Sequence, residues 1–258
     1  MSRIVAWAPC LEKAMSSIVD ERGFNQGFKL TASQQVRLRR RADAIAAEMD
    51  LPVDPVARAR IRILELGCGT GELAWELVKI TGAGVTGVDL SPKFIEQASA
   101  LHSHPHLDFR IVDLTQSSPA SAEEKFHYIV GNGILHHLYY RLDSLLPALA
   151  HWTTPGGRLI FWEPNLFNPY VFLIFKIPFL RRLARLEPDE MAFSPRFIRD
   201  RLNAAGFTKI KAVTRDFLLP NTPRDLVSIV VRVGDWFEKA PIIRAWAQSV
   251  FIVATVPS

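Results

Sequence analysis

Glycines are concentrated early in the chain, at Leu64–Leu73, where the sequence reads LELGCGTGEL. The residues just before them, RIRILEL at 60–66, form the short apolar run of a buried strand. The residues after them, ELAWELVKITG at 72–82, have the apolar spacing of a helix and end on glycine, a common helix stop. A strand, a glycine-rich turn and a helix predict the edge of a parallel α/β sheet at which ligands bind.

The chain downstream repeats this alternation of apolar runs and amphipathic segments. Further strands are expected at 84–90, 106–114, 126–133 and 156–164, with helices at 91–103 and 141–153. The rhythm then changes to a helix at 193–207, a strand at 208–219, a helix at 224–240 and a strand at 249–256. Strands that alternate with helices indicate a doubly wound parallel sheet. We therefore predict a Rossmann-like α/β sheet of seven strands, mostly parallel, in which the last two strands form an antiparallel hairpin at one edge.

The first 58 residues differ from the rest in being polar and helical in pattern. SQQVRLRRRADAIAAEMD at 33–50 is rich in helix formers with apolar residues at helical spacing, and PVDP at 52–55 ends that helix as a linker. We expect 1–58 to form a helical N-terminal lid and 59–258 to form the main domain. An apolar stretch at about 165–192 interrupts that domain as an insertion.

Composition places the chain among ordinary globular proteins, since 48% of its 258 residues are hydrophobic and 22% are charged. The two cysteines, Cys10 and Cys68, form no disulfide framework and fit a reducing compartment. The N-terminal segment is too short and too interrupted by charge for a signal peptide, so we expect a cytoplasmic protein. A net charge of +5 permits an anionic partner but requires none.

The glycine turn carries acids that make a phosphate ligand unfavourable. The dinucleotide pattern G-x-G-x-x-G/A needs a third small residue, and Glu72 stands in its place. With Glu65 just before the turn, the site favours a cationic or hydroxyl-bearing group. Asp89 ends the second strand, where a carboxylate can accept from both hydroxyls of a ribose, and Asp113 ends the third, where it can accept from an adenine amine. A nucleoside cofactor without a phosphate cradle describes S-adenosylmethionine (SAM).

Four motifs in order, LELGCGTGEL, TGVDLS, FRIVDL and IVGNGILHHL, resemble those of the class I SAM-dependent methyltransferases over residues 60–164. The resemblance implies that the turn glycines let the backbone pass close to the methionine part of SAM. It also implies that Asp89 holds the ribose and that Asp113 and Leu114 frame the adenine, with Asn132 beside the cofactor. The expected cofactor-binding residues are Glu65, Gly67, Cys68, Gly69, Gly71, Asp89, Leu90, Asp113, Leu114 and Asn132.

Candidate catalytic residues follow the fourth and fifth strands. ILHHL places His136 and His137 where the acceptor of the methyl group should lie, and Glu163 ends the fifth strand in WEPN. A hydroxyl acceptor needs a base to remove its proton. We expect His137 in that role, with His136 as second choice and Glu163 as the other candidate. Two structural alternatives stay open: one histidine packs against the following helix, and Glu163 bonds backbone N–H groups of its own loop.

Two clusters of charged or metal-ligating residues lie outside this set. HSHPH at 102–106 is far from the predicted pocket and has no cysteine beside it, so we interpret it as a solvated loop and expect no metal. RLRRR at 37–41 spreads its charges around a helix, which is typical of a solvated face. Alternatively, one of these arginines clamps the SAM carboxylate. GNGI at 131–134 replaces the Asn/Asp-Pro-Pro-aromatic motif of DNA amino methyltransferases, so a nucleic-acid substrate is not expected.

The insertion is unusually apolar. NLFNPYVFLIFKIPFLRRLARL at 165–186 is interrupted by Pro169 and Pro178. Its apolar core of about 11 residues is well short of the ~20 that span a bilayer. We interpret it as a roof over the active site, with a peripheral membrane contact through its arginines as the alternative. EPNLFNP and DEMAFS on either side resemble, more loosely, a bacterial subgroup of methyltransferases from secondary-metabolite or cell-envelope pathways.

Together these patterns predict a SAM-dependent methyltransferase that modifies an O or N atom of a small, partly apolar molecule. SAM is the expected cofactor, and S-adenosylhomocysteine (SAH) is its product. One alternative is a membrane-associated methyltransferase of a lipid or lipid-linked sugar. Another is a SAM-binding partner protein without catalysis of its own. The patterns indicate neither the acceptor nor an oligomeric state.

Overall fold

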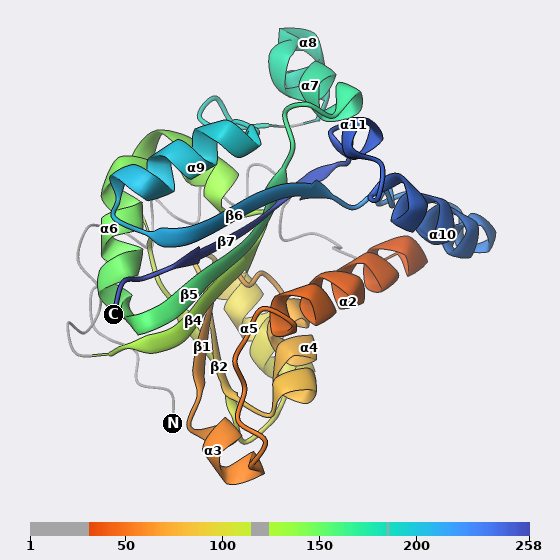
Figure 1. Ribbon diagram of the computed structural model, residues 1–258. Coiled ribbons are helices and arrows are strands. Elements are labelled where there is room, and N and C mark those ends of the chain that lie inside the picture. The colour runs from red at the N-terminus through yellow and green to blue at the C-terminus, as the bar shows by residue number, and fades with distance from the viewer. Residues whose placement is uncertain (1–30, 115–123, 185) are drawn as a thin grey trace.

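The strands of the computed structural model, which describes residues 31–114, 124–184 and 186–258, pair in the order β3-β2-β1-β4-β5-β7-β6. Neighbours from β3 to β5 are parallel, and β7 runs antiparallel to both β5 and β6 (Figure 1). The predicted seven-stranded sheet with an antiparallel last strand is therefore confirmed. The strands are β1 (Arg62–Leu66), β2 (Gly84–Asp89), β3 (Leu107–Ile111), β4 (Phe126–Asn132), β5 (Thr153–Pro164), β6 (Thr208–Arg215) and β7 (Ser249–Thr255).

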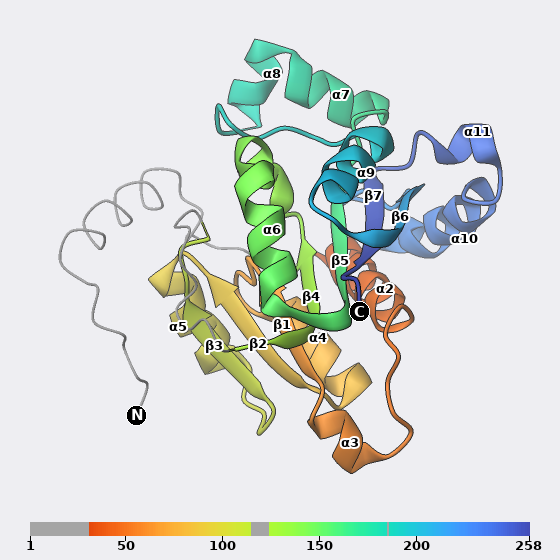
Figure 2. The same cartoon turned by 60° about the vertical axis from the view of Figure 1, so that its left-hand side comes forward.

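Helices cover both faces of this sheet, and Figure 2 shows α6 and α9 on one face with α2 and α4 on the other. Their labels follow Figure 1. The α-helices are α2 (Ala32–Ala46), α3 (Pro55–Ala59), α4 (Glu72–Thr81), α5 (Pro92–Leu101), α6 (Leu142–Trp152), α7 (Pro169–Lys176), α8 (Pro178–Leu183), α9 (Pro195–Ala204), α10 (Val227–Phe237) and α11 (Pro241–Arg244). Two 3-10 helices, η1 (Leu135–Arg141) and η2 (Arg224–Leu226), precede α6 and α10.

Four of the helices begin with the same local chemistry. An Asp, Ser or Asn caps α3, α5, α7 and α9 by accepting from the backbone N–H three residues on, and a proline follows each cap. The cap satisfies a donor that the first turn leaves free, and proline has no N–H to satisfy at that position. These starts are therefore fixed by adjacent residues.

Two apolar cores hold the layers together. On one face, Leu142, Leu146 and Leu149 of α6 pack with Ile198 of α9 against β1, β4, β5 and β7. On the other face, Ile45 of α2 and the apolar side of α4 pack against the same strands. The central strands β1, β4, β5 and β7 are buried on both faces, which is why they read as near-continuous apolar runs, whereas the edge strand β3 has no buried residue.

The described part of the N-terminal extension is tied to the sheet. The expected helix at 33–50 is present as α2, although it ends at Ala46, and the expected linker at 52–55 leads into the short helix α3. Ala42 and Ile45 of α2 are fully buried. Residues 1–30 of the predicted lid lie outside the described residues.

The last two strands differ from a simple hairpin. They are antiparallel, as expected, but β7 lies inside the sheet between β5 and β6, so that β6 forms the edge. Residues 216–248, which contain η2, α10 and α11, connect the two strands. The antiparallel direction of the two strands was therefore predicted correctly, but the term hairpin did not describe the long connection between them.

The insertion leaves and re-enters the sheet at one point. Asn165 forms an isolated parallel bridge with Phe193, and the backbone N–H of Phe193 donates to Pro164 O at 3.0 Å. Between these residues, α7 and α8 stand beyond the carboxyl ends of the strands (Figure 1). Phe175 of α7 is buried. None of the helices in the described part of the chain is long and apolar enough to cross a membrane.

Candidate active site

The turn after β1 has a backbone that side chains cannot follow. Gly67, Gly69 and Gly71 have φ values of 61°, 53° and 84°, in the left-handed region that favours glycine. A Cβ on Gly67 would lie 2.6 Å from Ile134 Cδ1, which follows β4. The turn therefore presents bare backbone at the carboxyl edge of the sheet, where open α/β sheets bind ligands.

A buried acid stands beneath this turn. Glu65 is 2% exposed, and burial raises the pKa of its carboxyl well above the usual value. Its Oε2 has no hydrogen-bond partner among the described residues. A buried polar atom without a partner is costly, and an ammonium group beside it would supply both a donor and a compensating charge.

A cavity of about 320 Å³ lies between the turn and α2. Among the predicted residues, its lining contains Glu65, Gly67, Cys68, Gly69 and Asn132. Gly71, Asp89, Leu90, Asp113 and Leu114 lie outside that lining. The Cys68 thiol is buried, and burial together with the charges of Glu65 and Asp89 raises its pKa, so it stays a neutral wall of the cavity.

Two acids that the sequence predicts as cofactor-binding residues, Asp89 and Asp113, lie at or just beyond the ends of β2 and β3. Asp89 accepts from the backbone N–H of Gly69 and of Ser91, each at 2.9 Å. Burial raises the pKa of Asp89, whereas the backbone hydrogen bonds and the charge of His137 lower it. Burial has the larger effect, so the pKa is raised overall. Leu90, Asp113 and Leu114 are half-buried beyond the ends of their strands.

The arginines of α2 contradict the expected solvated face. Arg37 Nε lies 2.5 Å and Arg41 Nη2 2.7 Å from Asp216 Oδ2, and Arg41 Nη1 donates to Asn132 Oδ1 at 2.5 Å. Arg40 pairs with Asp235 of α10. Burial, aided by the charge of Arg37, lowers the Arg41 pKa to about 10. The spacing of the arginines around the helix suggested a solvated face, but acids that are distant in the sequence pair with them in the fold.

The carboxylate of Glu163 is fully occupied by donors of the η1 turn. Its Oε1 accepts from the backbone N–H of Leu135 at 2.7 Å and of Ile134 at 3.1 Å, and its Oε2 accepts from that of His136 at 3.2 Å. Oε2 also lies 2.9 Å from His136 Nδ1. The Glu163 side chain has no exposed surface, so it holds His136 and η1 in place and does not face the open site.

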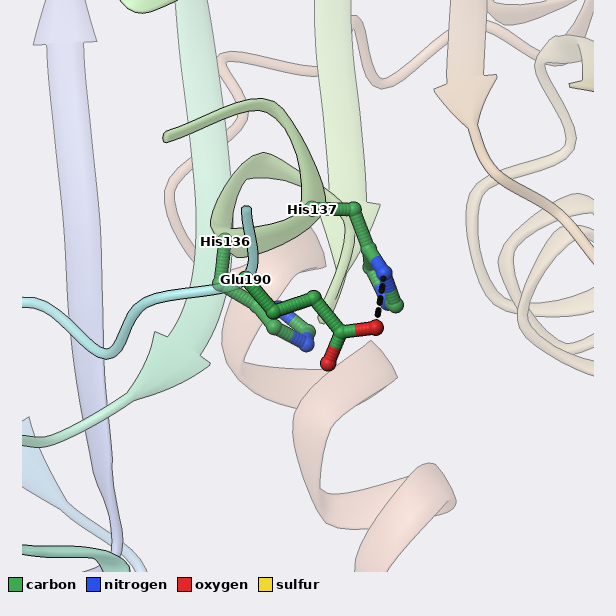
Figure 3. A group of neighbouring side chains, drawn as sticks. All are labelled: His136, His137 and Glu190. Atoms are coloured by element: carbon green, nitrogen blue, oxygen red, sulfur yellow. Dashed lines mark ion pairs between the residues drawn. The ribbon is translucent and has the colours of Figure 1, made fainter. Parts of the chain in front are cut away.

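His137 has a different partner, which no motif in the sequence indicated. Its Nδ1 lies 3.0 Å from Glu190 Oε1, with the ring 35% exposed and the Glu190 carboxylate 3% exposed (Figure 3). Burial lowers the pKa of His137, but Glu190, aided by Glu163 and Asp189, outweighs burial and raises it overall. The DEMAFS motif contains Glu190, yet nothing local in that motif pointed to a histidine partner.

The remaining histidine cluster lies apart from the site. His102 stacks on Trp75 of α4 with ring centroids 5.4 Å apart, and His104 meets the same ring edge-on at 6.4 Å. The HSHPH loop therefore packs partly on α4 and is less solvated than expected.

A family model described as "Methyltransferase domain" matches residues 64–159. Among curated relatives, trans-aconitate 2-methyltransferase of Streptomyces avermitilis is 33% identical over 51% of this chain and 48% of its own length. Demethylmenaquinone methyltransferase of Chlorobaculum parvum is 30% identical over 58% of this chain and 63% of its own length. The chain thus spans about half to two thirds of the length of these relatives.

Solved structures share the fold at low identity. A SAM-dependent methyltransferase from Archaeoglobus fulgidus superposes with a TM-score of 0.58 at 18% identity, covering 93% of this chain and 99% of that one. Magnesium protoporphyrin IX methyltransferase from Synechocystis PCC 6803, solved with bound SAH, gives 0.57 at 17% identity, covering 95% and 97%.

The fold and site define a Rossmann-like protein whose turn suits a nucleoside cofactor with a cationic tail. The family match over residues 64–159 and these relatives make the chain similar to the class I SAM-dependent methyltransferases. The residues present fit SAM, because the unpartnered Glu65 oxygen meets the need of an ammonium group and because Gly67 and Gly69 line the same cavity.

Proposed function

We propose that this protein transfers the methyl group of SAM to an O or N atom of a small, partly apolar molecule, with His137 as the general base. The observation that carries this proposal is the His137–Glu190 pair. It lies at the carboxyl edge of the sheet with a ring that is partly exposed, and its charge acts on the pKa of Asp89 at the cofactor side. A histidine between the cofactor site and solvent is in a position to reach an acceptor.

The chain's own residues would bind, orient and deprotonate. SAM, when bound, supplies the electrophilic methyl group. Glu65 would hold the ammonium of its methionine part, and Arg37 or Arg41 of α2 would meet its carboxylate, so that α2 acts as the lid. Glu190 accepts from His137 Nδ1–H, which leaves Nε2 free to take the proton of an acceptor hydroxyl.

The acceptor side is partly apolar. The Phe175 ring of α7 lies edge-on to His136 with centroids 6.2 Å apart, so the insertion reaches the candidate base region. Curated relatives include ubiquinone biosynthesis O-methyltransferases and a malonyl-[acyl-carrier protein] O-methyltransferase. These names favour an oxygen acceptor on this chain too.

The first test is calorimetric titration of SAM and SAH into the wild type and Asp89→Ala. Hydrogen bonds to a charged group contribute about 1.5–3 kcal/mol each, so we expect the variant to lose at least tenfold in affinity. Asp108→Ala is the matched control, because Asp108 is exposed on β3 and pairs with Arg110. Equal SAM affinity in all three proteins would contradict the assigned cofactor site.

The second test measures SAH release with candidate acceptors. The panel begins with trans-aconitate, demethylmenaquinone and malonyl-acyl carrier protein, which the names of relatives supply. SAM binding without SAH release across amines, carboxylates and hydroxylated aromatics would favour the non-catalytic partner protein.

A membrane-associated enzyme is the second candidate, favoured by the surface of the insertion. Phe172, Phe179 and Leu183 of α7 and α8 are 48%, 66% and 71% exposed, and Lys176 and Arg182 are exposed among them. Apolar side chains with interspersed cations are typical of a helix that lies in a lipid interface. Arg181 does not contribute, because it donates to the carbonyls of Phe175 and Glu190.

Flotation on vesicles of equal parts phosphatidylcholine and phosphatidylglycerol tests this candidate. This candidate requires that the wild type floats and that the double variant Phe172→Ser/Phe179→Ser stays in the soluble fraction. Val53→Ser is the control, since Val53 is 91% exposed outside the insertion. A wild type that stays in the soluble fraction would leave the small soluble acceptor as the better proposal.

A further inference from the structure

Three metal-ligating side chains converge beside the cofactor site. His136 and His137 come from η1, Glu190 comes from the segment before α9, and each offers a ligand atom within 4.8 Å of the other two. Figure 3 shows the Glu190 carboxylate between the two imidazole rings. In a tetrahedral zinc site, bonds of about 2.0–2.2 Å separate ligand atoms by ~3.4 Å. Small side-chain rotations would therefore bring the three atoms onto one ion.

A second carboxylate already sets the tautomer that such a site needs. Glu163 Oε2 lies 2.9 Å from His136 Nδ1 and has no exposed surface. A buried carboxylate on Nδ1 keeps the hydrogen there and leaves the lone pair on Nε2. Histidines that ligate metals almost always donate their other ring N–H to such a partner. This contact is independent of the convergence of the three ligands.

The backbone around the ligands is held in place. The N–H of Met191 donates to His136 O at 3.1 Å, which joins the Glu190 segment to η1. Arg181 Nη1 donates to Glu190 O at 3.1 Å. Glu190 is 2% exposed, so its carboxylate is already desolvated and ordered. A cation would meet ligands that need little further ordering.

The donor set selects the kind of metal. Two imidazoles and one carboxylate match the three protein ligands of catalytic zinc sites, which leave a fourth position open. Calcium and magnesium prefer sites made of oxygen ligands. The group therefore suits zinc and its neighbours among the divalent transition metals.

We propose that His136, His137 and Glu190 bind one divalent transition-metal cation of the zinc type, and that this ion and the base role of His137 exclude each other. The second clause rests on the proposed function. A ring nitrogen that ligates the ion has no lone pair for a proton, and Glu190 cannot both ligate the ion and orient His137 as it does here. A site of this kind would make methyl transfer sensitive to free zinc.

The binding clause is tested with cobalt as the spectroscopic probe. Full-length protein stripped with a chelator is titrated with Co²⁺, followed by its visible absorption, and Zn²⁺ is then used to displace it. We expect one saturable site that is lost in Glu190→Gln and His136→Gln. In Glu163→Gln we expect affinity lower by about 10–100-fold, the usual effect of removing the carboxylate behind a ligating histidine.

His104→Gln is the matched control, because His104 belongs to the separate cluster on α4 and should bind cobalt as the wild type does. Thermal melts of every variant verify that it is folded. The absence of a saturable cobalt band in the wild type would overturn the binding clause. A band that persists in both Glu190→Gln and His136→Gln would also overturn it.

The exclusion clause has a readout that needs no acceptor. Diethyl pyrocarbonate modifies an imidazole nitrogen only through its lone pair, and mass spectrometry reports the modified site. We expect Zn²⁺ to protect His137 in the wild type but not in Glu190→Gln, with exposed His106 modified equally throughout. Equal modification of His137 with and without zinc would overturn the exclusion. Failure of SAM to bind would instead contradict the proposed function and leave the cobalt result standing.

Discussion

The two sides of the carboxyl edge are built in different ways. On the cofactor side, the shape of the site comes from backbone conformation, with three glycines at positive φ and Asp89 bonded to the turn itself. On the acceptor side, His136 and His137 take their orientation from Glu163 and Glu190, which come from distant parts of the chain. Under the proposed function, cofactor binding is therefore mainly a property of local sequence, whereas activation of the acceptor depends on tertiary structure.

The largest expected effect separates the two sides cleanly. His137→Ala should lower kcat by about 10²–10⁴-fold, the usual contribution of a general base, and should leave SAM affinity unchanged. The measurement combines SAH release with calorimetric titration. His151→Ala, an exposed histidine at the end of α6, serves as control. A parallel loss of SAM affinity in His137→Ala would show that the sides are not separate.

A substitution of Asp216, the partner of Arg41 of α2, tests the limit of this comparison. This part of the cofactor side depends on a contact between residues that are far apart in the sequence. Asp216→Asn leaves Arg41 buried without its charge partner and should destabilise the fold by about 3–5 kcal/mol. Asp235→Asn is the matched control, because its partner Arg40 lies on the same helix as Arg41. The Arg40–Asp235 pair is 38% and 47% exposed and should contribute about 0–1 kcal/mol. Denaturant unfolding measures both.

The pH dependence of that effect has a definite sign. Burial raises the pKa of Asp216, but the charges of Arg41 and Arg37 outweigh it, so the folded value is lowered. A lowered carboxyl pKa contributes stability that is complete above the unfolded value of about 3.9 and is lost as pH falls through the folded value. The gap between wild type and Asp216→Asn should therefore narrow in acid. A gap that stays constant with pH would contradict this account.

A smaller effect is expected from the turn. Gly67→Ala should cost about 1–2 kcal/mol for its positive φ, with a further penalty for the contact with Ile134 Cδ1, and should weaken SAM binding. Gly82→Ala carries the same dihedral cost, since Gly82 has φ 67°, but it faces open space at the end of α4. Thermal melts and titrations of the pair sharpen the comparison. Equal stability of the two variants would show that a side chain at position 67 makes no unfavourable contact with Ile134.

The smallest expected effect is a displacement of the pH profile. Activity that needs neutral His137 should rise with pH through the pKa of that ring, which Glu190 holds above its usual value. In Glu190→Gln this pKa falls, so the acidic limb of the rate profile should move to lower pH. Glu76→Gln, whose carboxylate pairs with Lys79 on α4, should leave the limb in place. An unchanged limb in Glu190→Gln would remove His137 as the base.

The parts that could be predicted from sequence are those set by neighbouring residues. Strand runs, proline-marked helix starts and the glycine turn are local patterns, and the acids Glu65 and Asp89 belong to the same motifs. The antiparallel last strand followed from the family resemblance and from the break in the alternation of elements, whereas the order of the strands in the sheet was not predicted.

The rest could not be predicted because it joins residues that sequence spacing does not relate. The pairing of Arg41 with Asp216 depends on the turn after β6, where Asp216 has φ 75°. The pairing of His137 with Glu190 depends on how the insertion returns to the sheet. In each case a charged residue was visible in the sequence, but its partner lay across the fold.

The bridge between Asn165 and Phe193 makes the insertion modular. The chain between them begins and ends at adjacent points of the sheet, so its length can change without altering the gap that it must close. The free-energy cost of closing a loop grows slowly with its length, by about 0.6 kcal/mol per doubling. Related proteins could therefore carry a different segment here and keep the residues that would bind the methyl donor. Because Glu190 lies within this segment, the same exchange would also replace the partner of His137, the proposed base.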